Sequence, residues 1–253
     1  MSYLGLSQAA TLAERLGHTD EATRWRNHAA QIRAAWAQAF QGAGDENERT
    51  YITALWPSEI AAGPDVKAAL LRGLAARRKE RDPGGEFRET PLWTYFELAE
   101  AHQWLALGDP DTAYSVLRWF WKRQSSPGLY TWWEDSTENN SYHRWDKLRG
   151  WTNPPAVTPH YWTTAEVLLL QLDMLAMPAM GRHGPALVLG AGVPASWLTD
   201  SLGVQGLRVV GRTVDWSWDG RRVRARVNGA PIELRLGPSF PPGTPLDLVS
   251  GSR

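Results

Sequence analysis

Residues 128 to 145, GLYTWWEDSTENNSYHRW, combine aromatic rings with acids and amides in one short stretch. Within it, Trp132 and Trp133 stand directly before Glu134 and Asp135. Indole rings offer flat apolar faces that can stack on a sugar ring, while carboxylates and amides can hydrogen-bond sugar hydroxyl groups. The stretch therefore predicts a carbohydrate site, with solvated loop acids as the alternative interpretation.

Other residues nearby extend the same pattern. Five tryptophans lie between positions 132 and 162, together with several asparagines and histidines. We expect Asp135 and Asn139 to bind hydroxyl groups, with Asn140 as an equal candidate. We expect His160 at the N-terminus of a helix, where free backbone N–H groups and the helix dipole favour a polar ligand. The alternative for His160 is a capped structural histidine.

Helical patterns fill the first two thirds of the chain and would position these residues. Apolar residues recur at steps of three and four from about residue 7 to 177. Gly17 and Gly108 each end such a pattern shortly before an Asp that can begin the next helix. The segments 91–107 and 162–176 are apolar nearly all round, as is typical of inner helices covered by an outer layer. The sequence therefore predicts helical hairpins.

The remaining third of the chain has a different period. Apolar and polar residues alternate there, which predicts short strands. The Asp-Gly pair at 219–220 and the Asn-Gly pair at 228–229 favour two-residue hairpin turns. The sequence therefore predicts a mainly α protein with a β tail. We expect a helical domain at residues 1–178 and a small antiparallel, β-sandwich-like domain at residues 179–253.

The order of four segments resembles the C-terminal half of the six-hairpin glycosidases. These are inverting (α/α)6-barrel enzymes of carbohydrate metabolism that include the α-rhamnosidases. The four segments are residues 108–113, 128–135, 158–166 and 187–198. The resemblance covers roughly residues 9 to 236. It implies a glycoside hydrolase with part of an (α/α) toroid, of about six helices here, followed by a β-sandwich.

The resemblance also implies roles for particular residues. Glu134 would be the general base that activates water, with Trp132 and Trp133 lining the sugar subsite. His160 would point into the mouth of the barrel. Because loops at that end line the cleft in the family, Trp56 and Glu59 of the segment WPSE would contact substrate too. A charge in the first turn of a helix is the alternative for Glu59.

One part of an inverting glycosidase is missing from the sequence. Such an enzyme needs a general acid about 6.5–9.5 Å from its base. In the family this acid comes from the N-terminal half of the barrel, which has no counterpart here. We therefore expect weak or no hydrolysis by this chain alone. The exposed inner helices would associate with a missing N-terminal half or with other copies of the chain. A non-catalytic carbohydrate-binding protein and a helical scaffold that needs a protein partner are the alternatives.

Composition narrows the classes of partner and cofactor. The chain has 27 Lys and Arg against 27 Asp and Glu, so nucleic acid and anionic membranes are not expected as partners. It has no cysteine, which excludes disulfides, thiolate chemistry and Cys-based zinc sites. Its 6 histidines lack the spacing of metal ligands, so we expect no metal and no other cofactor. No signal peptide pattern opens the chain and no run of about 18 apolar residues follows, which favours a cytoplasmic protein without a membrane span.

Overall fold

A computed structural model describes residues 2–39, 53–61, 68, 70–75, 93–124, 128–132, 134, 159–181 and 184–249 of the chain. The chain divides into two compact units, Met1–Leu92 and Trp93–Arg253. The predicted domain boundary after residue 178 falls within the second unit, inside its first strand. In the described residues, no helix is both long and apolar enough to cross a membrane.

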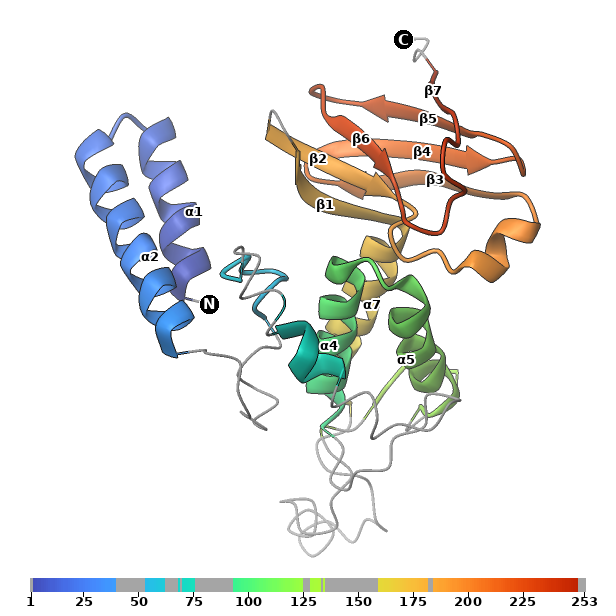
Figure 1. The fold of residues 1–253 in the computed structure, drawn as a ribbon, viewed down its shortest axis with the longest axis horizontal. Helices are drawn as coiled ribbons and strands as arrows, with labels where there is room; N and C mark the ends of the chain where they lie inside the picture. Colours follow the sequence, from blue (N-terminus) through green and yellow to red (C-terminus); the bar gives the residue numbers. More distant parts are fainter. Residues whose placement is uncertain are drawn as a thin grey trace, which may run out of the picture. The chain divides into compact units, whose positions relative to one another are not determined.

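The first unit begins with a helical hairpin. Helices α1 (Ser2–Arg15) and α2 (Thr19–Ala39) lie side by side and are joined by a tight turn (Figure 1). Gly17 ends α1 in the left-handed region, with φ 82°, as predicted. The buried residues of the hairpin are all alanines, so small side chains allow the two helices to approach closely. Residues 53–61 form turns and residues 70–75 are helical.

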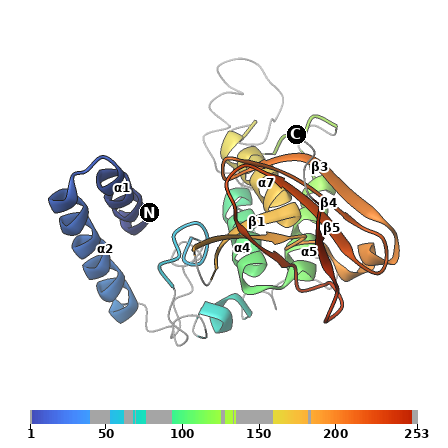
Figure 2. The ribbon, with the colours of Figure 1, turned by 90° about the horizontal axis from the view of Figure 1, so that it is seen from above.

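Three helices form one group in the second unit: α4 (Thr94–Leu107), α5 (Pro110–Lys122) and α7 (Tyr161–Leu175) (Figure 2). Helix α4 ends at Gly108, which has φ 82°. Asp109 then caps α5 by accepting a hydrogen bond of 3.0 Å from the backbone N–H of Thr112, with Pro110 in the first turn. The predicted α4–α5 hairpin is therefore confirmed. Helix α4 contacts both α5 and α7.

Helices α4 and α7 differ in how they are covered. Helix α4 is buried on most of its surface, including the polar residues Glu97, Glu100, His102 and Gln103. Helix α7 buries one face and leaves large apolar side chains exposed on the other, among them Tyr161, Trp162, Leu168 and Leu169. The prediction of an inner, covered helix is thus confirmed for α4 and only in part for α7. The described helices do not by themselves show a toroid.

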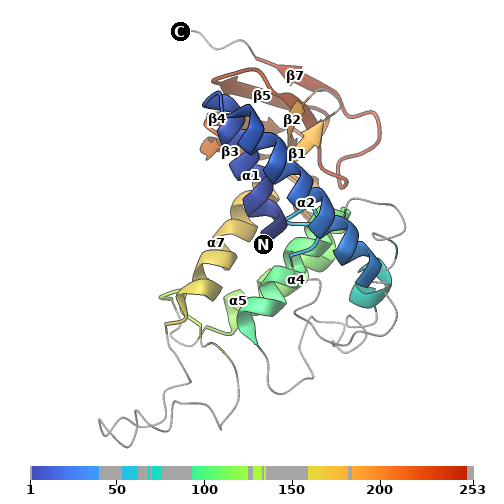
Figure 3. The ribbon, with the colours of Figure 1, turned by 90° about the vertical axis from the view of Figure 1, so that its left-hand side faces the viewer.

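The β part follows α7 without a linker, at the end where α7 stops (Figure 1, Figure 3). It forms two sheets, one in the order β1-β2-β6 and the other in the order β3-β4-β5-β7. The strands are β1 (Ala176–Gly181), β2 (Gly184–Leu189), β3 (Leu202–Val209), β4 (Arg212–Trp218), β5 (Val223–Asn228), β6 (Glu233–Leu236) and β7 (Leu246–Leu248). A mainly α protein with a β tail is therefore confirmed.

The prediction of a purely antiparallel domain was wrong. Strands β2 and β6 pair in parallel, and so do β5 and β7. Each of these pairs joins strands that are distant in sequence, so no tight hairpin sets their relative direction. The hairpin turn predicted at Asn228–Gly229 was also wrong. This pair connects β5 to β6, which belongs to the other sheet. The hairpin predicted at Asp219–Gly220 is confirmed between β4 and β5.

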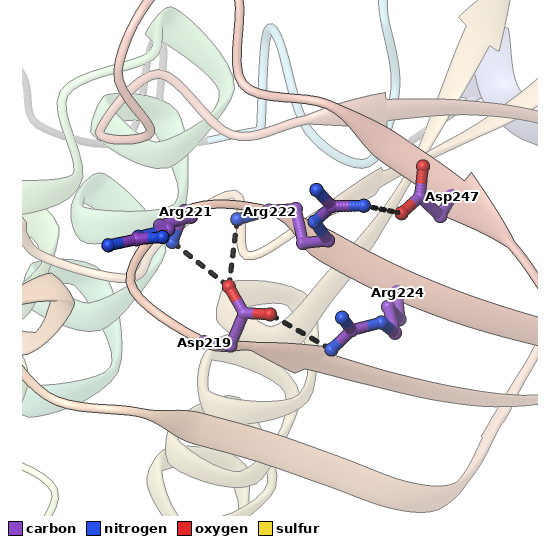
Figure 4. A network of polar contacts seen from close by, with 5 residues as sticks. All are labelled: Asp219, Arg221, Arg222, Arg224 and Asp247. Atoms are coloured by element: carbon purple, nitrogen blue, oxygen red, sulfur yellow. Dashed lines mark hydrogen bonds and ion pairs between the residues drawn. The ribbon is translucent and has the colours of Figure 1, made fainter.

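A polar network holds this β4–β5 turn (Figure 4). Asp219 accepts hydrogen bonds from the backbone N–H groups of Arg221 and Arg222, both at 3.0 Å. Its second carboxylate oxygen accepts from the Arg224 guanidinium at 2.9 Å, and Arg222 pairs with Asp247 of β7 at 3.1 Å. Since the hydrogen bond from the backbone of Arg222 stabilises the ionised form, the pKa of Asp219 lies below its ordinary value.

The two sheets share one hydrophobic core. Trp216 and Trp218 of β4 meet the ring of Phe240 edge to face, at centroid distances of 6.2 and 5.5 Å. The indole N–H of Trp216 donates to the backbone oxygen of Leu175 at 3.1 Å, so the last residue of α7 is tied to the core of the sheets. Gly192 also lies against Met174 of α7, so closely that a Cβ atom there would clash with it. These contacts fix the end of α7 to the β part.

Candidate functional site

The loop of residues 128–134 lies against the N-terminal ends of α4 and α7. The backbone N–H of Thr94, the first residue of α4, donates to the backbone oxygen of Glu134 at 3.0 Å. The backbone N–H of His160, which precedes α7, donates to the backbone oxygen of Trp132 at 2.9 Å. The loop therefore bridges the starts of two neighbouring helices. It brings the backbones of Glu134, Trp132 and His160 into one place.

A buried chain of hydrogen bonds connects the same helix ends. The hydroxyl oxygens of Thr94 and Thr163 lie 2.6 Å apart, and the Thr163 hydroxyl lies 2.7 Å from Nδ1 of His160. Thr94 also directs its hydroxyl to the backbone oxygen of Glu134 at 3.2 Å. Both threonines are fully buried. Because polar groups buried in this way are costly unless paired, the chain fixes how α4, α7 and the loop fit together.

His160 is buried, and its surroundings shift its pKa. Burial lowers the pKa of His160 below its ordinary value, and the negative charge of nearby Glu134 partly opposes that effect. The imidazole is therefore neutral around pH 7. The charge of Glu134 therefore acts on the His160 ring. The Glu134 side chain itself is partly exposed. This place thus includes a carboxylate with access to solvent and a neutral imidazole.

Trp132 was expected to line the sugar subsite, but its ring is not exposed there. Its ring is fully buried, and its indole N–H donates to the backbone oxygen of Phe120 at 2.9 Å. It also meets the Phe120 ring edge to face at a centroid distance of 6.0 Å. A ring without exposed surface has no face for stacking on a sugar, so Trp132 anchors the loop to α5. This burial could not be predicted from the sequence, because the partner lies on another element.

The remaining candidates fall into two groups. Trp133, Asp135 and Asn139 lie outside the described residues, as does Asn140. Trp56 and Glu59 belong to the first unit, where Trp56 is partly buried and Glu59 is exposed. Glu59 has a left-handed backbone, with φ 53°. Of the predicted set, the described residues of the second unit bring together Glu134, Trp132 and His160.

Sequence analysis missed a buried ionic cluster between α4 and α7. His102 of α4 has Nδ1 at 2.5 Å from Oε1 of Glu166 and Nε2 at 3.3 Å from Oδ2 of Asp173. Both acids come from α7. Burial acts to lower the pKa of His102, but the hydrogen bonds with Asp173 and Glu166 outweigh it and raise the pKa. The two carboxylates therefore favour the protonated form of the imidazole between them. The available signal was the seven-residue spacing of the two acids within an apolar helix, which puts them on one face.

Aromatic rings border the site on the solvent side. Trp162, in the first turn of α7, is 69% exposed. Its ring lies 5.9 Å from the His160 ring and 6.0 Å from the Tyr95 ring, measured between centroids. Burial and the charge of Glu166 raise the pKa of Tyr95, so its phenol stays protonated. This end of the α4–α7 pair therefore combines an exposed indole, a neutral imidazole, a hydroxyl donor and a carboxylate.

Within the described part of the chain, no group of three or more His, Asp or Glu side chains is arranged to hold a metal ion. Comparison with known proteins adds no identity: no protein-family model matches the sequence, and no curated protein or solved structure matches it. The chemistry of the site has to be inferred from its own geometry.

Proposed function

We propose that this chain contributes the carbohydrate site of an inverting glycoside hydrolase, with Glu134 as the general base. The observation that carries the proposal is the place of Glu134. Its backbone oxygen accepts a hydrogen bond from the first backbone N–H of α4, its side chain is partly exposed, and its charge acts on the neutral imidazole of His160. An exposed indole and a protonated phenol border the same place. The proposal includes the helices as part of an (α/α)6 toroid.

In inversion, the base takes one proton from a water molecule while the water oxygen bonds to the anomeric carbon. The bond from that carbon to the leaving oxygen breaks on the opposite side of the sugar, and a second carboxylic acid protonates the leaving oxygen. Glu134 would take the proton, and the neutral His160 beside it would not neutralise the carboxylate as a cation would. Since Nδ1 of His160 lies 2.7 Å from the Thr163 hydroxyl, the orientation of the ring at the start of α7 is fixed.

A second function, carbohydrate binding without hydrolysis, is favoured by one specific observation. Hydrolysis needs a general acid, which contributes a factor of about 10²–10⁴ in rate. The described acids of α4 and α7 are buried: Glu100 accepts from the Trp104 indole N–H at 3.2 Å, and Glu166 is engaged by His102. No acid in the described part of the chain is therefore assigned as the partner of Glu134.

Turnover and binding separate the two functions. The test uses 4-nitrophenyl glycosides of rhamnose, glucose and mannose, with Glu134→Gln compared with the wild type. Glu233→Gln, a change of the same kind on β6, serves as the control. We expect hydrolysis to fall by roughly 10²–10⁴ in Glu134→Gln only, while affinity for the sugars changes little. If the wild type releases nitrophenol no faster than Glu134→Gln does, the hydrolase proposal is contradicted. Binding without turnover then remains.

A further inference from the structure

We infer that Trp162 is the ring on which a neutral sugar stacks at this site, with Tyr95 beside it as a hydroxyl-binding group. The inference rests on the proposed function and names the residue and the class of sugar. Of the tryptophans that the structure describes at this site, Trp132 is fully buried and Trp93 is partly buried, whereas Trp162 is 69% exposed. Of these three, Trp162 offers the most open ring face to a ligand.

The surroundings of Trp162 separate it from an ordinary surface residue. It stands two positions after His160, so the exposed indole and the buried imidazole share the start of α7. Its contact with Tyr95 is edge to face, with an interplanar angle of 65°, and therefore does not stack one ring on the other. A tryptophan side chain carries about 150–250 Å² of surface, most of which stays in water here. That apolar area is available to the C–H face of a pyranose.

The polar groups beside the indole match the hydroxyl rim of a sugar. Tyr95 keeps a protonated phenol as a donor, and the Glu134 carboxylate is an acceptor. Among the described residues, Glu166 is paired with His102, His160 is neutral, and Glu134 supplies an unpaired negative charge when it is ionised. A sugar that carries a carboxylate or phosphate would be repelled. The geometry therefore favours neutral pyranosides over uronic acids.

A competing explanation is that Trp162 belongs to the exposed apolar face of α7, together with Leu168 and Leu169, and only packs against protein. The two explanations differ in what neighbouring substitutions do. Tyr161 is 73% exposed and directly adjacent, and Leu169 is 42% exposed two turns further along the helix. If the whole apolar face packs against protein, substitutions at Tyr161, Trp162 and Leu169 should have similar effects on sugar binding. If Trp162 is a sugar platform, it alone controls sugar affinity.

The experiment measures binding of methyl α-L-rhamnopyranoside, methyl α-D-glucopyranoside, methyl α-D-mannopyranoside and methyl α-D-glucuronide to the full chain by saturation-transfer difference NMR. The variants are Trp162→Ala and Trp162→Phe, with Tyr161→Ala and Leu169→Ala as matched controls. Circular dichroism checks that each variant is folded. We expect Trp162→Ala to weaken binding of at least one neutral glycoside roughly tenfold or more, as removal of an aromatic platform does. Trp162→Phe should recover part of the affinity, and the controls should stay within about twofold.

Two results would overturn the inference, and they have different meanings. If the wild type binds a neutral glycoside and Trp162→Ala binds it equally well, the platform lies elsewhere while the proposed function stands. If the wild type binds none of the four glycosides, the proposed function fails and the inference fails with it. Tighter binding of the glucuronide than of its neutral counterpart would contradict the inferred class of sugar.

Discussion

Glu166 of α7 places its Oε1 atom 2.5 Å from Nδ1 of His102 on α4, in the buried interface between the two helices. Asp173, two turns further along α7, lies on the other side of the same imidazole. Together these contacts fix the rotation of α7 about its axis and its position along α4. Because His160 and Trp162 are at the start of α7, the cluster also determines where they stand relative to the Glu134 loop.

Removing the imidazole should therefore destabilise the protein strongly. In His102→Asn, two carboxylates remain buried without a cation, and breaking a buried ion pair costs about 3–5 kcal/mol. Urea unfolding of this variant should show a loss of that size in the free energy of unfolding. His18→Asn is a suitable control because His18 is exposed. Equal stability of the wild type and His102→Asn would contradict an ionic cluster.

The same histidine should make stability depend on pH. Its pKa is raised in the folded protein above the ordinary value of 6.5. The stabilisation is therefore fully present below pH 6.5, and it is lost as pH rises through the higher folded-state pKa. We expect the unfolding free energy of the wild type to decline over that range relative to His102→Asn. Parallel curves for the two proteins would show that His102 does not titrate in this way.

The closeness of Glu134 and His160 can be tested by titration. Burial lowers the pKa of His160, and the Glu134 charge counteracts part of that effect. Glu134→Gln should therefore lower the pKa of His160 further, whereas Glu59→Gln, in the first unit, should leave it unchanged. NMR of a protein labelled only at histidine follows each ring through its titration. A His160 pKa that is insensitive to Glu134→Gln would place the carboxylate away from the ring.

The hydroxyl pair of Thr94 and Thr163 predicts non-additive substitutions. Thr163→Val leaves the buried Thr94 hydroxyl and Nδ1 of His160 without this partner, at a cost of about 1–3 kcal/mol. Thr94→Val should cost a similar amount. The double variant should cost less than the sum, because the second substitution removes a hydroxyl that has already lost its contact with the other threonine. Thr11→Val, at an exposed helical hydroxyl, is the control. Strict additivity in urea unfolding would rule out the coupling.

Local patterns predicted the elements that depend on local residues. The helix stop at Gly108, the cap by Asp109 and the turn at Asp219–Gly220 all follow from neighbours within a few positions. Strands β6 and β7 pair in parallel with strands reached only after intervening elements, so nothing local sets their direction. The periodicity that predicts a strand is the same for parallel and antiparallel neighbours.

The candidate site likewise combines features that neighbouring residues predict with contacts between distant residues. His160 before a helix and Glu134 in a loop were predictable from the residues around them, and the structure brings them together. The burial of Trp132 depends on Phe120, twelve positions earlier on another element. The His102–Glu166 contact joins residues 64 positions apart. Such contacts follow from how helices pack, so no short motif could reveal them.

The most direct measurement is histidine NMR of the full chain during addition of a neutral methyl glycoside. The His160 resonances, identified by their loss in a His160→Gln variant, report on the site. The exposed His18 and His28 of the α1–α2 hairpin report on the first unit. We predict that saturating glycoside shifts the His160 ring resonances and leaves those of His18 and His28 in place. If the glycoside binds and the His160 resonances do not move, the sugar site lies elsewhere and Glu134 is not its base.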